Sequence, residues 1–237
     1  VAAVAIVVIL LASPDIEAPL RAVRAANPQR PAGVIATAVA NWRVLGSIGI
    51  GAAILAGLRA ARMIVLPLWA AWAGLDPALA ALIIGLGAAV DAALFYAGGW
   101  VMDRFGRRWT VVPAMVGLAL GNLVLAAGSI QGTPLAWFIA GTVLLALSNG
   151  ISSGVLMTLG SDFADPVHPA AFLSVWRLEC TLGGAIAPLA VAGVTAIASI
   201  GAATGVTAVV GLIGAGILWV TTSSMQRDHR TSGKIDG

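Results

Sequence analysis

The sequence has few charged residues: Asp, Glu, Lys and Arg make up only 10% of its 237 residues, whereas soluble domains carry about 25%. Hydrophobic residues make up 59% of the chain, and its mean hydropathy is +0.99. A chain this poor in charge cannot cover a water-facing surface with polar groups, which argues against a soluble enzyme or a nucleic-acid-binding module. The composition indicates an integral membrane protein.

Cysteine and histidine are also scarce. The single cysteine, Cys180, excludes an internal disulfide framework and a site built from several thiolates. The two histidines, His168 and His229, lie outside the apolar segments, so we expect no metal site and no cofactor. No glycine-rich phosphate loop is present, and no specific Ser-His-Asp set can be assembled. We therefore predict that the protein is not an enzyme.

The sequence contains several long segments without charged residues. A helix needs about 20 apolar residues to cross the hydrocarbon of a bilayer. Residues 109–161 and 180–226 contain no charged residue, and each run corresponds to about two spans. Residues 44–72 and 78–100 form a further pair of apolar segments. The sequence therefore predicts six spans within residues 44–224.

Short breaks separate the paired spans. Asp76 is the expected N-cap of one helix, and Pro77 is its first residue. Thr133 and Pro134 are expected to play the same parts in the next pair.

The segments outside the six spans are assigned from length and charge. Residues 1–13 are mostly apolar but too short to cross the membrane, so we expect them to be the end of a truncated transmembrane helix. Residues 14–43 are predicted to form a cytoplasmic loop, and residues 225–237 a cytoplasmic tail.

Basic residues and tryptophans predict the orientation. Arginine and lysine occur only in alternate connections, which by the positive-inside rule places residues 14–43 and the C-terminus in the cytoplasm. All eight tryptophans lie near predicted span ends, as expected for rings at headgroup depth; they are Trp42, Trp69, Trp72, Trp100, Trp109, Trp137, Trp176 and Trp219.

Three charged residues inside the predicted spans are candidates for a solute pathway, because buried charges in a membrane face a cavity or one another. Arg59 and Arg62 share one face of the first span, and Asp91 lies in the second. Helix geometry favours an Arg59–Asp91 pair, with Arg62 either functional or extended toward the interface. A packing contact without a solute role is the alternative for the pair. The unbalanced arginine favours anionic or carboxylate-bearing substrates.

Other polar residues and prolines in the spans extend this candidate set. Asn149 could bind a substrate or hydrogen-bond a neighbouring helix. Glu179 could be a proton site or the partner of a cytoplasmic arginine, and we favour the second interpretation. Coupling to protons is expected through Asp91 or Glu179. Pro67 and Pro188 can kink their helices.

The segment between the second and third spans, residues 99–108, has the most specific pattern. Gly99 is expected to allow close approach of a neighbouring helix, and Asp103 to accept from N–H groups that begin the following helix. Gly106 permits a tight reversal of the chain. The arginines are expected at the cytoplasmic face, where they could be no more than topological anchors; they are Arg104, Arg107 and Arg108.

This pattern, G-x-x-x-D-R-x-G-R-R, resembles the signature loop of the major facilitator superfamily. Residues 145–154 and 172–188 are similar to the tenth and eleventh helices of that family. The resemblance covers essentially the whole chain and makes its spans helices 7 to 12, with the first six helices absent. It implies two inverted three-helix repeats, hence an all-α six-helix transmembrane bundle, and a substrate path near the midplane between two six-helix halves.

The resemblance also implies a function. It suggests the C-terminal half of a secondary transporter of a small organic solute in the cell inner membrane, working by proton-coupled efflux. Gly183, Gly184 and Pro188 resemble the Gly/Pro motif of antiporters in the family. The expected partners are the lipid bilayer, the solute and an N-terminal six-helix half, with no nucleic acid. A self-contained six-span scaffold or assembly protein and a non-functional fragment are the alternatives.

Overall fold

The computed structural model describes residues 33–164 and 169–232, with side chains up to residue 222. The described residues all belong to one compact unit. The predicted helix end at 1–13, most of the predicted loop at 14–43 and the end of the tail lie outside the described residues.

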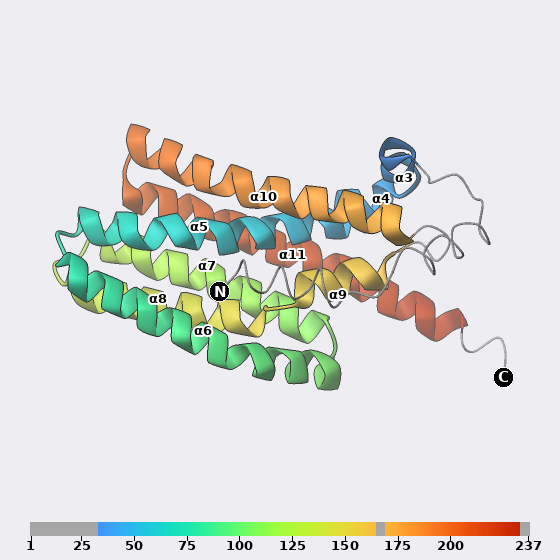
Figure 1. Ribbon diagram of the computed structural model, residues 1–237, viewed down its shortest axis with the longest axis horizontal. Helices are drawn as coiled ribbons and strands as arrows, with labels where there is room; N and C mark the ends of the chain where they lie inside the picture. The colour runs from blue at the N-terminus through green and yellow to red at the C-terminus, as the bar shows by residue number, and fades with distance from the viewer. Residues whose placement is uncertain (1–32, 165–168, 233–237) are drawn as a thin grey trace, which may run out of the picture. The chain divides into compact units, whose positions relative to one another are not determined.

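The described part of the chain consists of helices and their connections, without strands. The helices are α3 (Val34–Ala40), α4 (Trp42–Val44), the π-helix η1 (Leu45–Gly49), α5 (Ile50–Trp72), α6 (Pro77–Phe105), α7 (Arg108–Gly128), α8 (Pro134–Ile151), α9 (Val155–Asp162), α10 (Pro169–Ile197) and α11 (Ile200–Ser232). Figure 1 shows the long helices running side by side.

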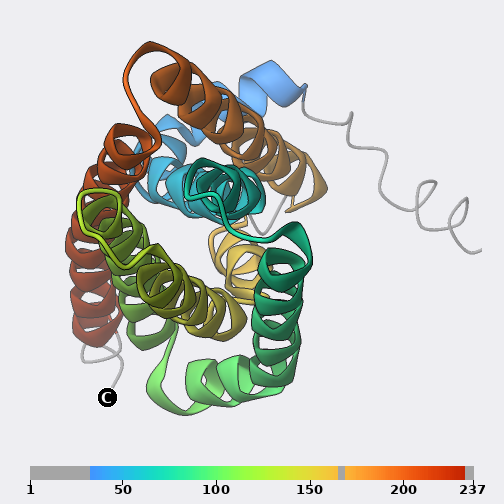
Figure 2. The same ribbon diagram turned by 90° about the vertical axis from the view of Figure 1, so that its left-hand side faces the viewer.

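Among the described residues, six helical segments are long and apolar enough to cross a membrane, which confirms the number predicted within residues 44–224. The connections at residues 73–76, 129–133 and 198–199 lie at one end of the bundle, here called the Gly74 end (Figure 1). Figure 2 views the bundle from that end. The opposite end, which holds the connection between α6 and α7, is called the Gly106 end.

The packing of the six spans follows an inverted repeat. The main helix pairs are α5 with α10, α6 with α8, α7 with α11, α7 with α8 and α5 with α11. Exchanging α5 with α8, α6 with α10 and α7 with α11 leaves this set of pairs unchanged. The members of each exchanged pair are three positions apart in the order of the spans, with two spans between them, so they run in opposite directions. This matches the predicted arrangement of two inverted three-helix repeats.

Helix starts were largely predictable. The Asp76 carboxylate accepts from the backbone N–H of Leu79 at 3.0 Å, and Pro77 begins α6, as expected. Helix α8 begins at Pro134, but its N-cap Thr133 makes no side-chain capping bond. Gly74 has a φ of +65°, a conformation that suits glycine in the tight connection between α5 and α6.

The fourth span is not one continuous helix. Helix α8 ends at Ile151, and α9 begins at Val155 after Gly154, whose φ is +84°. This left-handed conformation costs glycine little and cannot continue a right-handed helix. The interruption was not predicted from the apolar run, because hydropathy does not register a local change of backbone conformation.

Helical structure also extends into segments predicted to be connections. Residues 34–40, within the predicted loop, form α3, and the π-helix η1 precedes α5. Helix α11 continues to Ser232, so the predicted tail begins inside it.

Two of the eight tryptophans do not lie at the surface. Trp69 and Trp176 are 0% and 1% exposed, and their indole N–H groups donate to the carbonyls of Leu125 and Leu156 at 3.0 and 2.9 Å. These side chains belong to the core, so their rings face neighbouring helices instead of lipid headgroups. A tryptophan near a span end can face a neighbouring helix as well as lipid.

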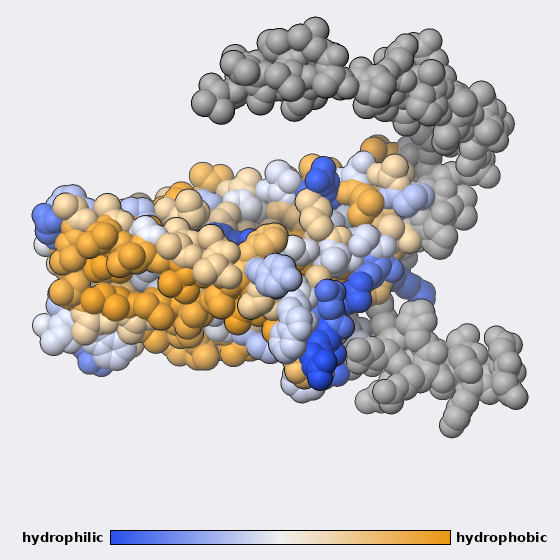
Figure 3. Space-filling view, turned by 60° about the horizontal axis from the view of Figure 1, so that its bottom comes forward, coloured by the Kyte–Doolittle hydropathy of each residue, from blue (hydrophilic) through white to orange (hydrophobic). Residues whose placement is uncertain are grey.

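Large apolar faces remain uncovered. Only 11% of the most apolar window of α6 and 6% of that of α10 is buried, against about half for most other spans. Figure 3 shows one such face, where apolar residues spread over most of the bundle and hydrophilic ones gather toward its ends. Such faces need an apolar surrounding, which the lipid of a membrane or further membrane helices can provide.

Candidate functional site

A polar cluster lies in the middle of the bundle around Asp91. This residue is the midpoint of α6, about 21 Å from either end of the helix. Its Oδ2 accepts from Nη2 of Arg62 on α5 at 2.8 Å and from Nδ2 of Asn149 on α8 at 2.6 Å. The side chains of Arg62 and Asp91 are 12% and 15% exposed. The structure thus brings three of the predicted pathway residues together from three helices.

The predicted Arg59–Asp91 ion pair was wrong, because Arg62 takes that position. Arg59 instead donates from Nη1 to the carbonyl of Ser152 at 3.1 Å. Ser152 lies in the interruption between α8 and α9, where a carbonyl can serve a partner outside its own helix. Two arginines one turn apart on α5 therefore have different partners: Arg62 binds the carboxylate, and Arg59 binds a carbonyl in the interruption between α8 and α9.

Close packing of α6 against α8 makes these contacts possible. A Cβ at Gly98 would lie 2.5 Å from the carbonyl oxygen of Ile151, and a Cβ at Gly150 would lie 2.7 Å from that of Asp91. Small residues let membrane helices approach in this way. The prediction that Gly99 serves as the contact was wrong by one position, because no atom lies within 4 Å of a Cβ built there.

Several buried polar atoms of the cluster have no partner. They are Arg62 Nε, Asn149 Oδ1 and Thr142 Oγ1. Thr142 precedes Asn149 on α8 by about two helical turns. Asn149 and Thr142 are 6% and 2% exposed. Unsatisfied polar atoms in such positions are costly unless something pairs with them. Thr142 was not predicted as a site residue, since a threonine in an apolar run carries no distinctive signal.

A pocket of about 400 Å³ adjoins this cluster, between α5, α6 and α8. Arg62 and Thr142 contribute to its lining, and so does Pro67. The remaining lining side chains are apolar or small, so the pocket has one charged region and otherwise hydrocarbon walls.

Glu179 lies apart from this cluster, on α10. A Cβ at Gly49 would overlap its carboxyl group, so Glu179 faces the π-helix η1 directly. Its Oε2 is buried without a hydrogen-bond partner, and no ion pair joins Glu179 to an arginine within the described ranges. The favoured interpretation, that it pairs with a cytoplasmic arginine, stays a prediction for the arginines outside those ranges. The π-helix beside it is a rare element that often occurs at functional sites.

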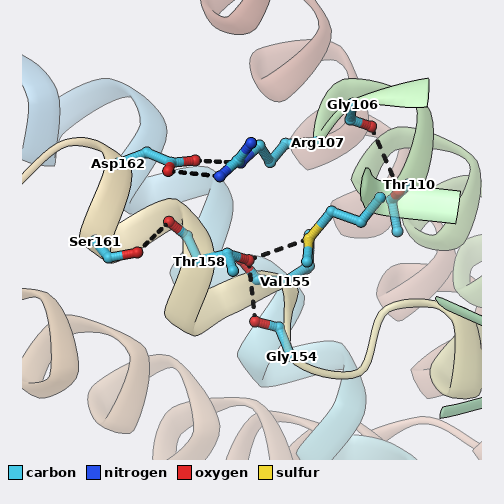
Figure 4. A network of polar contacts seen from close by, with 9 residues as sticks. Gly106, Arg107, Thr110, Gly154, Val155, Thr158, Ser161 and Asp162 are labelled. Atoms are coloured by element: carbon cyan, nitrogen blue, oxygen red, sulfur yellow. Dashed lines mark hydrogen bonds and ion pairs between the residues drawn. The ribbon is translucent and has the colours of Figure 1, made fainter. Parts of the chain in front are cut away.

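The signature loop, residues 99–108, is tied to α9 at the Gly106 end. Arg107 and Asp162 form a two-pronged ion pair, with Nη2 of Arg107 2.8 Å from Oδ1 of Asp162. Figure 4 shows the two side chains reaching toward each other, beside Thr158, whose hydroxyl lies 3.2 Å from the Met102 sulfur. The pairing of Arg107 with a carboxylate 55 residues later could not be predicted from the pattern of the loop.

The remaining residues of the loop have separate roles. Gly106 ends α6 with a φ of +89°, as its predicted role in a tight reversal requires. Asp103 lies inside α6 and is exposed, and the N-cap of α7 is Arg107 without a side-chain bond, so the predicted capping by Asp103 was wrong. Arg108 stacks 3.5 Å over the Trp219 ring, and Arg104 lies 5.8 Å from that of Trp100.

Two of the predicted hinge residues, Gly183 and Gly184, lie where α10 packs on α5. A Cβ at Gly183 would overlap the carbonyl group of Ala53, whereas one at Gly184 would meet its nearest atom only at 3.9 Å. Pro67 and Pro188 lie inside α5 and α10. Gly183 is therefore a close-contact position between the helices.

No group of three or more histidine, cysteine, aspartate or glutamate side chains that could hold a metal ion occurs in the part of the chain described.

Comparison with known protein families gives one match. The family model described as Major Facilitator Superfamily matches residues 48–235, which is more than half of the chain and includes the polar cluster and the signature loop. Comparisons with curated proteins and with solved structures found no match.

Proposed function

Because the chain belongs to the major facilitator superfamily, it is a multi-pass membrane transporter, and we propose that it moves a small organic solute along a path beside Asp91. The family consists of transporters, which agrees with the prediction that the protein is not an enzyme.

The observation that carries this proposal is the ion-paired cluster at the midpoint of α6. Charged side chains are expensive inside a bilayer and mark solute or ion pathways. Transporter sites lie near the bilayer midplane and use interrupted helices. Both features meet here, since Asp91 binds Arg62 and Asn149 while Arg59 binds the carbonyl of the interrupted span.

We further propose that transport is proton-coupled efflux, with Glu179 as the group that exchanges the proton. Its support is geometric: the carboxyl group faces the π-helix η1, and one of its oxygens is buried without a partner. Protonation would remove an uncompensated charge from the hydrocarbon. The resemblance of Gly183, Gly184 and Pro188 to the antiporter motif supports the direction of transport.

The Gly106 end, and with it the C-terminus, is proposed to face the cytoplasm. Its support is the positive-inside rule, since Arg104, Arg107 and Arg108 all belong to this end. We propose that the Arg107–Asp162 pair clamps the signature loop to α9 in one state of the transport cycle and opens in the other.

A second six-helix half is the proposed partner of this bundle. Transporters of this fold consist of two halves, each made of inverted three-helix repeats. The low burial of α6 and α10 supports the proposal, because both helices leave apolar faces uncovered.

Transport into proteoliposomes tests the solute path. The full-length protein is reconstituted and assayed with a panel of radiolabelled organic acids, amines and neutral solutes. Asp91→Asn removes the partner of Arg62, and we expect the transport rate of the accepted solute to fall at least about tenfold. Asp76→Asn is the matched control, since asparagine also caps helices and should leave transport nearly unchanged. Equal rates for Asp91→Asn and the wild type would exclude this path.

The proton step has its own test. Glu179→Gln keeps the size of the side chain but cannot exchange a proton, so an imposed pH gradient should no longer drive transport. Exchange of solute for solute without a gradient should continue. If the pH gradient still drives transport in Glu179→Gln, the proton is carried elsewhere.

A further inference from the structure

Two of the pockets between the spans differ in chemistry. The first, about 350 Å³ between α5, α10 and α11, has an almost purely apolar lining. Its hydroxyl-bearing residue, Thr207, already donates to the carbonyl of Ala203 at 2.8 Å. Nothing in that pocket could orient a charged or polar solute. The second pocket, between α5, α6 and α8, differs because Arg62 lines it.

The walls of the second pocket are otherwise apolar. Helix α5 contributes Met63, Leu66 and Pro67, and α6 contributes Ile84 and Ala88. A small inorganic ion would leave these apolar side chains without an apolar group to contact. An organic group of moderate size would cover them and replace the hydrocarbon contacts that the walls lack.

A positive charge that the protein does not balance lies beside the pocket, since Arg59 is one helical turn along α5 from the lining residue Arg62. One carboxylate, that of Asp91, faces two guanidinium groups: it forms an ion pair with Arg62, while Arg59 lies near it and donates its hydrogen bond to the neutral carbonyl of Ser152. A guanidinium has five N–H donors, and Arg59 uses one of them in the contacts described. An unpaired charge inside a protein in a membrane is strongly unfavourable. A negative group at this place would complete the cluster.

The unused polar atoms point to the same class of ligand. Nε of Arg62 is a donor without an acceptor, and the hydroxyl of Thr142, on a residue only 2% exposed, has no partner either. A carboxylate offers acceptor positions for both donors and is the preferred planar partner of guanidinium groups.

We propose that the solute is an amphipathic organic anion, whose carboxylate joins Arg59 and Arg62 and whose apolar body occupies the pocket between α5, α6 and α8. This assignment rests on the proposed transport function and names its substrate class. No new charge has to be created in the membrane, because the anion neutralises the excess positive charge as it enters the site.

Binding of matched aromatic probes to the full-length protein in lipid nanodiscs tests the substrate class. The probes are 2-naphthoate, its neutral methyl ester, the cation 2-naphthylmethylammonium, and acetate, which has the charge without the apolar body. Empty nanodiscs correct for partition into lipid. We expect 2-naphthoate to bind at least about tenfold more tightly than each of the other three.

Two pairs of variants locate the bound probe. In Arg59→Gln, 2-naphthoate binding should weaken at least about tenfold, whereas Arg59→Lys should keep a preference for the anion. Gly85 lines the pocket and has no atom within 4 Å of a built Cβ, so Gly85→Leu adds bulk at the pocket wall with room for its Cβ. This variant should weaken 2-naphthoate binding, while Gly216→Leu, equally unhindered but on α11, should not. Unfolding measurements confirm that all four variants remain folded.

The outcomes separate this inference from the transport proposal. Tighter binding of the cation or the ester, no binding of 2-naphthoate, or insensitivity to both Arg59→Gln and Gly85→Leu would overturn the anionic assignment. In those cases, loss of transport in Asp91→Asn would still support the path beside Asp91. If Asp91→Asn transports normally while 2-naphthoate binding responds as expected, the pocket binds anions outside the transport path, and the assignment of the transported solute is wrong.

Discussion

The two neighbouring glycines of α6, Gly98 and Gly99, offer a sharp test of how the site is held together. At Gly98 a methyl group would lie 2.5 Å from the carbonyl oxygen of Ile151, the last residue of α8. At Gly99 it would meet no atom within 4 Å. Changing each glycine to alanine adds the same group to the same helix, one position apart, so the pair differs in the contact with α8.

The size of the effect follows from these distances. Ordinary contact begins at 3.4 Å, so Gly98→Ala requires α8 to move by several tenths of an ångström up to nearly 1 Å. The opposing atom is backbone and cannot rotate away. Overpacking of this kind costs about 1–3 kcal/mol, while replacing glycine by alanine in a helix returns about 0.8–1 kcal/mol. The second contribution applies to both variants, so Gly98→Ala should be less stable than Gly99→Ala by about 1–3 kcal/mol.

Denaturant-induced unfolding in detergent micelles, followed by the loss of helical circular dichroism, measures this difference. A transport assay adds a second readout, because Ser152, whose carbonyl binds Arg59, comes directly after Ile151. Gly98→Ala should therefore reduce transport more than Gly99→Ala. Equal free energies of unfolding for the two variants would refute the close approach of α6 and α8 at Gly98.

Three further predictions concern the packing around the site. Gly183→Ala should unfold more easily than Gly184→Ala by about 1–3 kcal/mol, since the new methyl group would overlap a backbone carbonyl of α5; similar melting curves would contradict this. Trp69→Phe loses a buried indole hydrogen bond and should lower the free energy of unfolding by about 1–3 kcal/mol in denaturant titrations. A double-mutant cycle of Arg107→Ala and Asp162→Ala should give a coupling of only about 0.2–1 kcal/mol that weakens with salt, because the two side chains are 47% and 31% exposed.

Much of the fold was predictable because membrane insertion depends on quantities that sum along the chain. The number of spans follows from apolar length, which does not depend on how the helices pack. The start of α6 at Pro77 follows from a carboxylate and a proline next to each other. The candidate charged residues were also evident, because any charge within an apolar run stands out against its neighbours.

The contacts of those residues were not predictable. Arg59 and Arg62 are one helical turn apart, and either could have met Asp91. The choice depends on the rotation of α5 about its axis and on the distance between α6 and α8. Small differences in either decide which arginine reaches the carboxylate. Gly98 and Gly99 are neighbouring residues of the same type. Only the fact that Gly98 faces α8 and Gly99 does not distinguishes them.

The sequence by itself therefore determined that residues 42–222 supply six membrane-spanning segments and which polar residues lie within them, since both are properties of local composition. The tertiary structure decided which arginine remains unpaired, where the fourth span is interrupted and which pocket adjoins the charge. These features arise from distances between helices that are far apart in the chain, and local sequence does not encode such distances position by position.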